Sequence, residues 1–118
     1  MTIRGLQQEL AEFAAERDWQ QFHTPKNLAM ALAGESGELM EIFQWLTPEQ
    51  SAGIMADQAQ APRVREELAD VFAYLLRLAD VLDVDLEQAL AEKIAVNGAK
   101  YPVYLARGRA DKYTQLGG

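Results

Sequence analysis

The chain has 118 residues, no cysteine, 49% hydrophobic residues and a formal net charge of −7 at pH 7. The length suits one domain with a single core, and the acidic balance argues against a nucleic acid or an anionic membrane as partner. Without cysteine there is no disulfide and no thiolate metal site. No apolar run approaches the ~20 residues of a membrane span, and the N-terminus lacks a signal-peptide pattern. We therefore expect a single cytoplasmic domain over residues 1–118.

The apolar periodicity is helical almost everywhere, which predicts an all-α protein. The expected helices cover residues 3–17, 25–46, 62–82 and 86–99, with a mobile connection containing a helical turn at 47–61 and a mostly irregular tail at about 101–118. Thr24 and Pro25 form a typical N-cap and first helical position, and Asp85 can cap the last helix. The simplest architecture is a four-helix arrangement whose bundle is completed by oligomerisation.

The helix expected at 25–46 carries a glutamate inside its apolar stripe. Helical rotation of about 100° per residue places four residues within about 40° of Leu28: Leu32, Leu39, Ile42 and Leu46. Glu35 falls about 20° from Leu28, in the centre of the stripe, and Glu38 about 80° away, at its edge. Gly34 and Gly37 flank these acids, although a glycine inside a helix costs roughly 1 kcal/mol relative to alanine. We expect the glycines to let another helix or a ligand approach.

The helix expected at 62–82 is apolar on nearly all sides. Between Val71 and Leu82 only Arg77 and Asp80 are charged, which is typical of a helix buried on most sides. One apolar stripe consists of Leu68, Phe72, Leu75, Ala79 and Leu82, and a second runs from Glu67 and Asp70 through Tyr74, Leu78 and Val81. Glu67 and Asp70 are therefore expected on a covered face.

Two helices thus each present acids at positions i and i+3 on inward faces. The four acids are Glu35, Glu38, Glu67 and Asp70. Converging carboxylates repel one another, and a hard divalent cation removes that repulsion; Mg²⁺, with Mn²⁺ as second choice, takes oxygen ligands. Zinc prefers nitrogen or sulfur ligands. A di-iron bundle uses Glu-x-x-His pairs, and the one histidine, His23, lies outside both motifs. The alternative for a lone acidic pair is a solvated helix face.

At these residues the chain resembles a known family. "GESGELMEIFQW" and "REELADVFAYLL" look like the MazG-type, all-α nucleoside triphosphate pyrophosphohydrolases, whose signature is an E-x-x-E pair and a later E-x-x-D pair. "EFAAERDWQQFHTPKNLAMALAGESGEL" and "KYPVYLARGRADKYTQL" look like the branch that includes dCTP pyrophosphatase. The resemblance covers nearly the whole chain, and residues 47–61 are its least informative part. It departs at Leu10, where members closest to the dCTP enzyme carry histidine.

The resemblance implies a reaction, namely hydrolysis of a (deoxy)nucleoside triphosphate to the monophosphate and pyrophosphate with Mg²⁺, for nucleotide-pool house-cleaning. It assigns metal binding to Glu35, Glu38, Glu67 and Asp70. Our hypothesis for the general base is Glu38, because a residue at the edge of the stripe can also reach water.

Substrate contacts are expected on the aromatic loop before residue 25 and near the last long helix. The resemblance implies contacts from Trp19, Gln20, Gln21, Phe22, His23 and Trp45. Lys93, Asn97 and Tyr101 share one face and are expected to contact the triphosphate, with Lys112 and Tyr113 as weaker candidates. The alternative interpretation of the aromatic loop is that its side chains pack in the core. For Lys93, Asn97 and Tyr101 the alternative is a solvated helix end.

So small a chain can bury an apolar helix of this kind in a homo-oligomer, which we therefore expect. The resemblance implies a tetramer, with a dimer as the alternative. Two competing functions remain at this point. One is a non-catalytic helical module that binds metal and nucleotide. The other is a structural oligomer whose acids form interfacial salt bridges. The sequence also leaves open whether the base is cytosine, a modified cytosine or a damaged purine.

Overall fold

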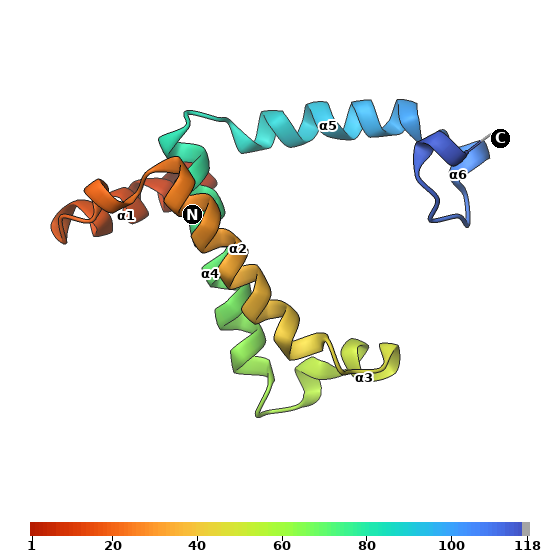
Figure 1. The fold of residues 1–118 in the computed structure, drawn as a ribbon, viewed down its shortest axis with the longest axis horizontal. Helices are drawn as coiled ribbons and strands as arrows, with labels where there is room; N and C mark the ends of the chain where they lie inside the picture. The colour runs from red at the N-terminus through yellow and green to blue at the C-terminus, as the bar shows by residue number, and fades with distance from the viewer. Residues whose placement is uncertain (117–118) are drawn as a thin grey trace. The chain divides into compact units, whose positions relative to one another are not determined.

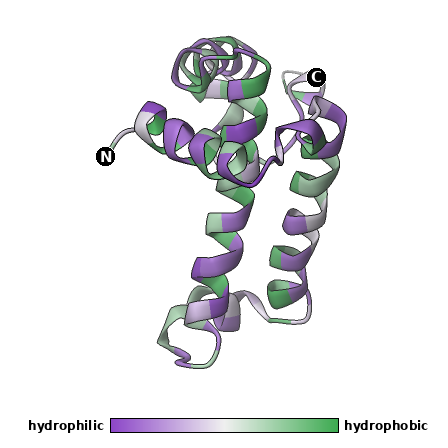
Figure 2. Ribbon diagram, turned by 90° about the vertical axis from the view of Figure 1, so that its left-hand side faces the viewer, coloured by the Kyte–Doolittle hydropathy of each residue, from purple (hydrophilic) through white to green (hydrophobic). Residues whose placement is uncertain are grey.

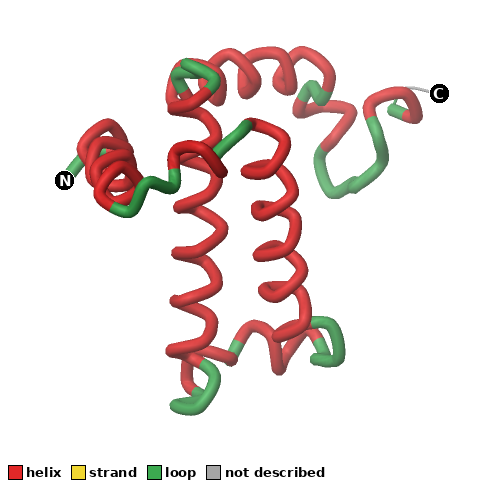
Figure 3. The backbone as a smooth tube through the Cα atoms, turned by 60° about the vertical axis from the view of Figure 1, so that its left-hand side comes forward, coloured by secondary structure: helices red, strands yellow, loops and turns green. Residues whose placement is uncertain are grey.

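A computed structural model describes residues 1–116 of the chain. The helices are α1 (Ile3–Glu16), α2 (Pro25–Phe43), α3 (Pro48–Ala52), α4 (Ala61–Val81), α5 (Leu86–Lys100) and α6 (Val103–Ala106), with single 3-10 turns at Gln20–Phe22, Ile54–Ala56 and Tyr113–Gln115 (Figure 1). No strand occurs within the described residues (Figure 3), which confirms the all-α prediction. None of the helices in this part of the chain has the length and apolar composition needed to cross a membrane.

Contacts divide the chain into two compact units, Met1–Asp83 and the residues from Val84 onward, and each unit is described by itself. In the first unit α2 and α4 lie side by side and run in opposite directions (Figures 1 and 3). Leu28 of α2 and Leu76 of α4 are fully buried. On α1, the Gln7 side-chain amide donates a hydrogen bond to the Leu76 carbonyl at 3.0 Å, and this bond ties α1 to α4.

Four helix positions agree with the sequence prediction, and one boundary was wrong. The Thr24 hydroxyl caps α2 by accepting from the Asn27 N–H, as expected. However, α2 ends at Phe43, three residues before the predicted end at 46. The reason is a capping box: the Thr47 hydroxyl accepts from the Gln50 N–H while the Gln50 side chain accepts from the Thr47 N–H. These bonds begin α3, so the 47–61 connection contains more regular structure than the single turn we expected.

The apolar stripe of α4 is exposed in the single chain. The relative exposure of Leu68 is 51%, that of Phe72 is 42% and that of Leu75 is 37%, whereas Ala79 on the same stripe is buried. Figure 2 shows hydrophobic residues alternating with hydrophilic ones along the long helices. The expectation of a helix buried on most sides is therefore not met within one chain.

No other helix among the described residues packs closely against Gly34 or Gly37. A Cβ atom built on Gly34 or Gly37 meets no heavy atom within 4 Å. The close approach of a helix predicted there is thus not made among the described residues, and an approach by a ligand or a partner stays a prediction.

Replacing Gly37 by alanine should raise the free energy of unfolding by about 0.5–1 kcal/mol, because alanine loses less backbone entropy in a helix and meets no neighbour here. Guanidinium denaturation of the two proteins at one concentration measures the difference. A loss of stability instead would mean that another chain covers this face of α2.

The second unit is built on α5 and is stabilised by contacts near its end. The Tyr101 and Tyr113 rings pack edge to face with centroids 6.1 Å apart, and the Lys100 ammonium lies over the Tyr113 ring. Arg109 forms an ion pair with Asp111. The tail is therefore largely irregular, as predicted, but α6 and a 3-10 turn give it local order.

Candidate metal centre and aromatic pocket

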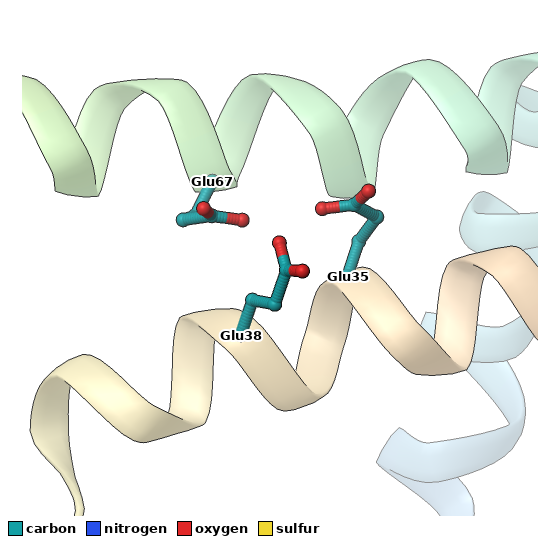
Figure 4. A group of neighbouring side chains, drawn as sticks. All are labelled: Glu35, Glu38 and Glu67. Atoms are coloured by element: carbon teal, nitrogen blue, oxygen red, sulfur yellow. The ribbon is translucent and has the colours of Figure 1, made fainter.

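Three of the four predicted acids converge between α2 and α4. Glu35 and Glu38 lie one turn apart on α2, and Glu67 faces them from α4 (Figure 4). One carboxylate oxygen from each lies within 4.8 Å of the other two. Asp70 is exposed and lies outside this group, but its negative charge contributes to the raised pKa of both Glu35 and Glu67. We call Glu35, Glu38 and Glu67 the acid cluster.

The acid cluster is unfavourable without a counter-charge. One Oε atom of Glu35 and one of Glu67 are buried without a hydrogen-bond partner. Burial first, and then the hydrogen bond and charge of Glu38 with the charges of Asp70 and Glu67, raise the pKa of Glu35 to about 7. Burial is also the main cause that raises the pKa of Glu67. Each of these shifts means that the folded chain disfavours the ionised carboxylates.

A divalent cation fits this donor set. Within residues 1–116 no lysine or arginine forms an ion pair with any member of the acid cluster. Unpaired buried carboxylate oxygens on two facing helices offer hard anionic ligands, which is the chemistry that Mg²⁺ and Mn²⁺ prefer. The acid cluster could therefore hold a metal ion.

The aromatic loop before α2 forms a pocket with the first turns of α2 and with Tyr74 of α4. Trp19, Phe22 and His23 line a cavity of about 290 Å³ together with Asn27, Leu28, Ala31 and Tyr74. The Asn27 side-chain amide donates to the Phe22 carbonyl at 3.1 Å and so holds the loop against the start of α2. The Trp19 ring packs edge to face on Phe13 with centroids 5.7 Å apart. We call this cavity the aromatic pocket.

A second cavity shares three lining residues with the aromatic pocket and reaches Asp70. Its volume is about 180 Å³, and its lining residues are Leu10, Phe13, Trp19, His23, Asp70, Ala73, Tyr74 and Arg77. Trp19, His23 and Tyr74 line both cavities, and Asp70 lies in the wall of the second one. The structure thus places Trp19 and His23 in the same cavity wall as Asp70, one of the predicted acids.

The other predicted substrate residues of the first unit, Gln20, Gln21 and Trp45, do not line either cavity. Gln20 and Gln21 are exposed, and the Gln21 amide donates to Asp18. Trp45 follows α2 with 86% of its surface exposed. Lys93, Asn97 and Tyr101 belong to the second unit, where the Tyr101 N–H donates to the Asn97 carbonyl; Lys112 and Tyr113 belong to it too. Substrate contacts from all of these residues stay predictions.

Sequence reasoning did not assign three polar residues of the cavity walls to the site, namely Asn27, Tyr74 and Arg77. A signal existed for two of them. Tyr74 and Arg77 follow Asp70 at spacings of four and seven residues, which places all three on one face of α4. Arg77 is also one of only two charged residues in the apolar stretch 71–82.

The chain is similar to known proteins in both sequence and fold. The MazG-like family matches residues 32–116. The chain is 50% identical over 119 residues to dCTP pyrophosphatase 1 of Bos taurus and 48% identical to that of Homo sapiens, covering 98% of this chain and 68% of each relative. The crystal structure of a pyrophosphatase from Archaeoglobus fulgidus is similar with a TM-score of 0.78 and 39% identity, over 84% of this chain and 91% of that one. The sequence matches and the similarity of fold agree, and the chain belongs to the MazG-like family.

Proposed function

We propose that this chain is a deoxynucleoside triphosphate pyrophosphohydrolase that uses a divalent cation, Mg²⁺ or Mn²⁺, and releases a monophosphate and pyrophosphate. The observation that carries the proposal is the pair of buried, unpartnered carboxylate oxygens on Glu35 and Glu67, in the same unit as a pocket of aromatic side chains. The names of the relatives support the reaction class. House-cleaning of the nucleotide pool is the role that fits it.

In the first unit, acidic residues bind the phosphate end of the nucleotide in this proposal, and aromatic residues bind its base. Glu35, Glu38 and Glu67, with Asp70 beside them, hold the cation, which neutralises phosphate charge when it is bound. Glu38 is the exposed member of the acid cluster, so it is placed to accept a proton from water. The water oxygen forms a bond to the α-phosphorus, the bridge between the α- and β-phosphates breaks, and pyrophosphate leaves with the bridging oxygen.

The base occupies the aromatic pocket in this proposal. Trp19 and Phe22 offer ring faces, on which a base stacks with about 1–3 kcal/mol. The proposed substrate is dCTP or a modified deoxynucleotide, in line with the relatives. The chain acts as one domain over residues 1–118 in this proposal, and the family match, which includes residues of both units, supports this. The triphosphate is contacted by Lys93, Asn97 and Tyr101.

The test is pyrophosphate release from a panel of canonical and modified deoxynucleoside triphosphates with Mg²⁺ or Mn²⁺. Metal binding by calorimetry is measured on the same samples. Release that requires the cation supports the proposal, and its ranking identifies the base. Cation and nucleotide binding without any release would favour a non-catalytic binding module instead.

We further propose that the enzyme is a homo-oligomer, a tetramer, which covers the exposed stripe of α4. A groove of about 410 Å³ adjoins this stripe and is lined mainly by apolar side chains of α1 and α4, among them Leu6, Leu10, Phe13 and Phe72. Exposed apolar surface of this extent is typical of an interaction site. The cytoplasmic location stays a prediction.

Replacing Phe72 by glutamate should shift the protein to a smaller species, because a charge on the covered stripe cannot be desolvated without a partner. Size-exclusion chromatography with light scattering measures the mass. Gln8→Glu adds the same charge at an exposed position of α1 and should leave the mass unchanged. A monomeric wild-type protein would overturn the oligomer proposal.

A further inference from the structure

Three charged side chains in contact with one another, Arg4, Asp80 and Arg77, lead to His23, the single histidine of the sequence. The Arg77 Nε–H donates a hydrogen bond to His23 Nδ1 at 3.1 Å. The Asp80 carboxylate lies 3.6 Å from an Arg77 Nη atom and accepts a hydrogen bond from Arg4 at 2.8 Å. The Arg77 side chain is only 12% exposed. Asp80 and Arg4 therefore hold the guanidinium in place, and the guanidinium in turn contacts the imidazole.

The direction of the Arg77–His23 bond decides where the histidine carries its proton. An arginine guanidinium is always protonated and can only donate, so Nδ1 must be the acceptor and carry no proton. A neutral imidazole then carries its proton on Nε2. Burial, followed by the positive charge of Arg77, lowers the pKa of His23, which keeps the ring neutral at pH 7. The imidazole thus has one N–H donor, Nε2–H.

His23 lines the same cavity as Asp70 and Arg77 of α4. Asp70, Tyr74 and Arg77 follow one face of α4, and seven residues of helix span about 10 Å from the acid to the arginine. His23 and Trp19 line both cavities along this face. A nucleotide with its phosphates near Asp70 and its base against Trp19 would present the edge of that base to His23.

We propose that Arg77 is a positioning residue for base recognition: it fixes His23 as the Nε2–H tautomer, so that His23 donates a hydrogen bond to an acceptor atom of the nucleobase. The inference rests on the proposed function for the identity of the ligand. The chemical class that fits is a base whose edge presents a carbonyl oxygen or an unprotonated ring nitrogen, as cytosine and guanine both do. Without Arg77 the ring would exchange between tautomers and rotate, and the base would lose a fixed donor.

The first test uses the single histidine as a spectroscopic reporter. In the wild-type protein labelled with ¹⁵N at histidine, Nδ1 should give the signal of an unprotonated ring nitrogen and Nε2 that of a protonated one. Arg77→Met should produce an average of both tautomers and imidazolium at the same pH. A protonated Nδ1 in the wild-type protein would overturn the proposal, and this measurement needs neither the variant nor catalysis.

The second test adds nucleoside monophosphates, which a pyrophosphohydrolase does not turn over. The His23 Nε2–H signal should move with dCMP or dGMP but not with 2-deoxyribose 5-phosphate, and the base that moves it identifies the preferred edge. No movement with either nucleotide would overturn the contact. A response to dCMP without pyrophosphate release from dCTP would leave this inference standing while the proposed function fails.

The third test is kinetic. Loss of one fixed hydrogen bond to the base should raise KM of Arg77→Met about fivefold and leave kcat unchanged, since base binding acts equally on the ground state and the transition state. Arg65→Met removes the same charge from an exposed site of α4 and should change neither constant. An equal KM for Arg77→Met and the wild type would count against the positioning role.

Discussion

Replacing Glu35 by glutamine should reduce pyrophosphate release about 100-fold or more. Glutamine keeps the shape of the side chain but removes a charged ligand from the centre of the acid cluster, and a divalent cation supplies several kcal/mol of transition-state stabilisation to reactions of phosphates. The Glu35 oxygen without a hydrogen-bond partner is the atom whose charge this substitution removes. Initial rates at saturating nucleotide and cation measure the loss.

The same substitution should not unfold the protein. In the metal-free chain the ionised form of Glu35 is disfavoured, so a neutral amide removes an unfavourable charge and should raise the melting temperature at pH 8. Glu41→Gln, an exposed site on the same helix, is the matched control and should keep full activity. Activity retained in Glu35→Gln with its metal dependence intact would remove Glu35 from the metal site.

The second large effect is the response of stability to pH and to divalent cations. The pKa of Glu35 rises from 4.5, its ordinary value, to about 7 in the folded metal-free chain. A raised pKa means that the folded state holds the Glu35 proton more tightly than the unfolded state does. The contribution of this proton to the free energy of unfolding is therefore complete below pH 4.5 and is lost as the pH rises through 7. The metal-free protein should therefore melt at progressively lower temperature between about pH 4.5 and pH 7.

A divalent cation should reverse this loss, because it binds the ionised carboxylates of the folded state. At a concentration of about 100 times its dissociation constant it adds roughly 2.7 kcal/mol, which raises the melting temperature of a chain of this size by about 10 °C. Melting curves in EDTA, Mg²⁺ and Mn²⁺ across the pH range measure both effects. Glu35→Gln should lack most of the pH slope. Melting that no cation alters would indicate that the acids serve an interface between subunits.

The sequence by itself determined most of the helices and the place of Glu35 within the apolar stripe of its helix. Helical phase is a local property, since the angle between two side chains of one helix follows from their spacing alone. That is why Glu35 could be placed in the apolar stripe, and why Thr24 and Asp85 could be identified as caps. The resemblance carried by the two acidic motifs then named the family that the comparisons confirmed.

Only the tertiary structure decided how the helices combine. Phase within a helix does not set the axial register between two helices, and this register brings Glu67 to Glu35 and Glu38 while leaving Asp70 beside the cavity. The contact between His23 and Arg77, 54 residues apart, is likewise non-local, so no spacing in the sequence predicts it. The early end of α2 came from a competing capping box at Thr47, whose two hydrogen bonds outweigh three further residues of weak helical pattern.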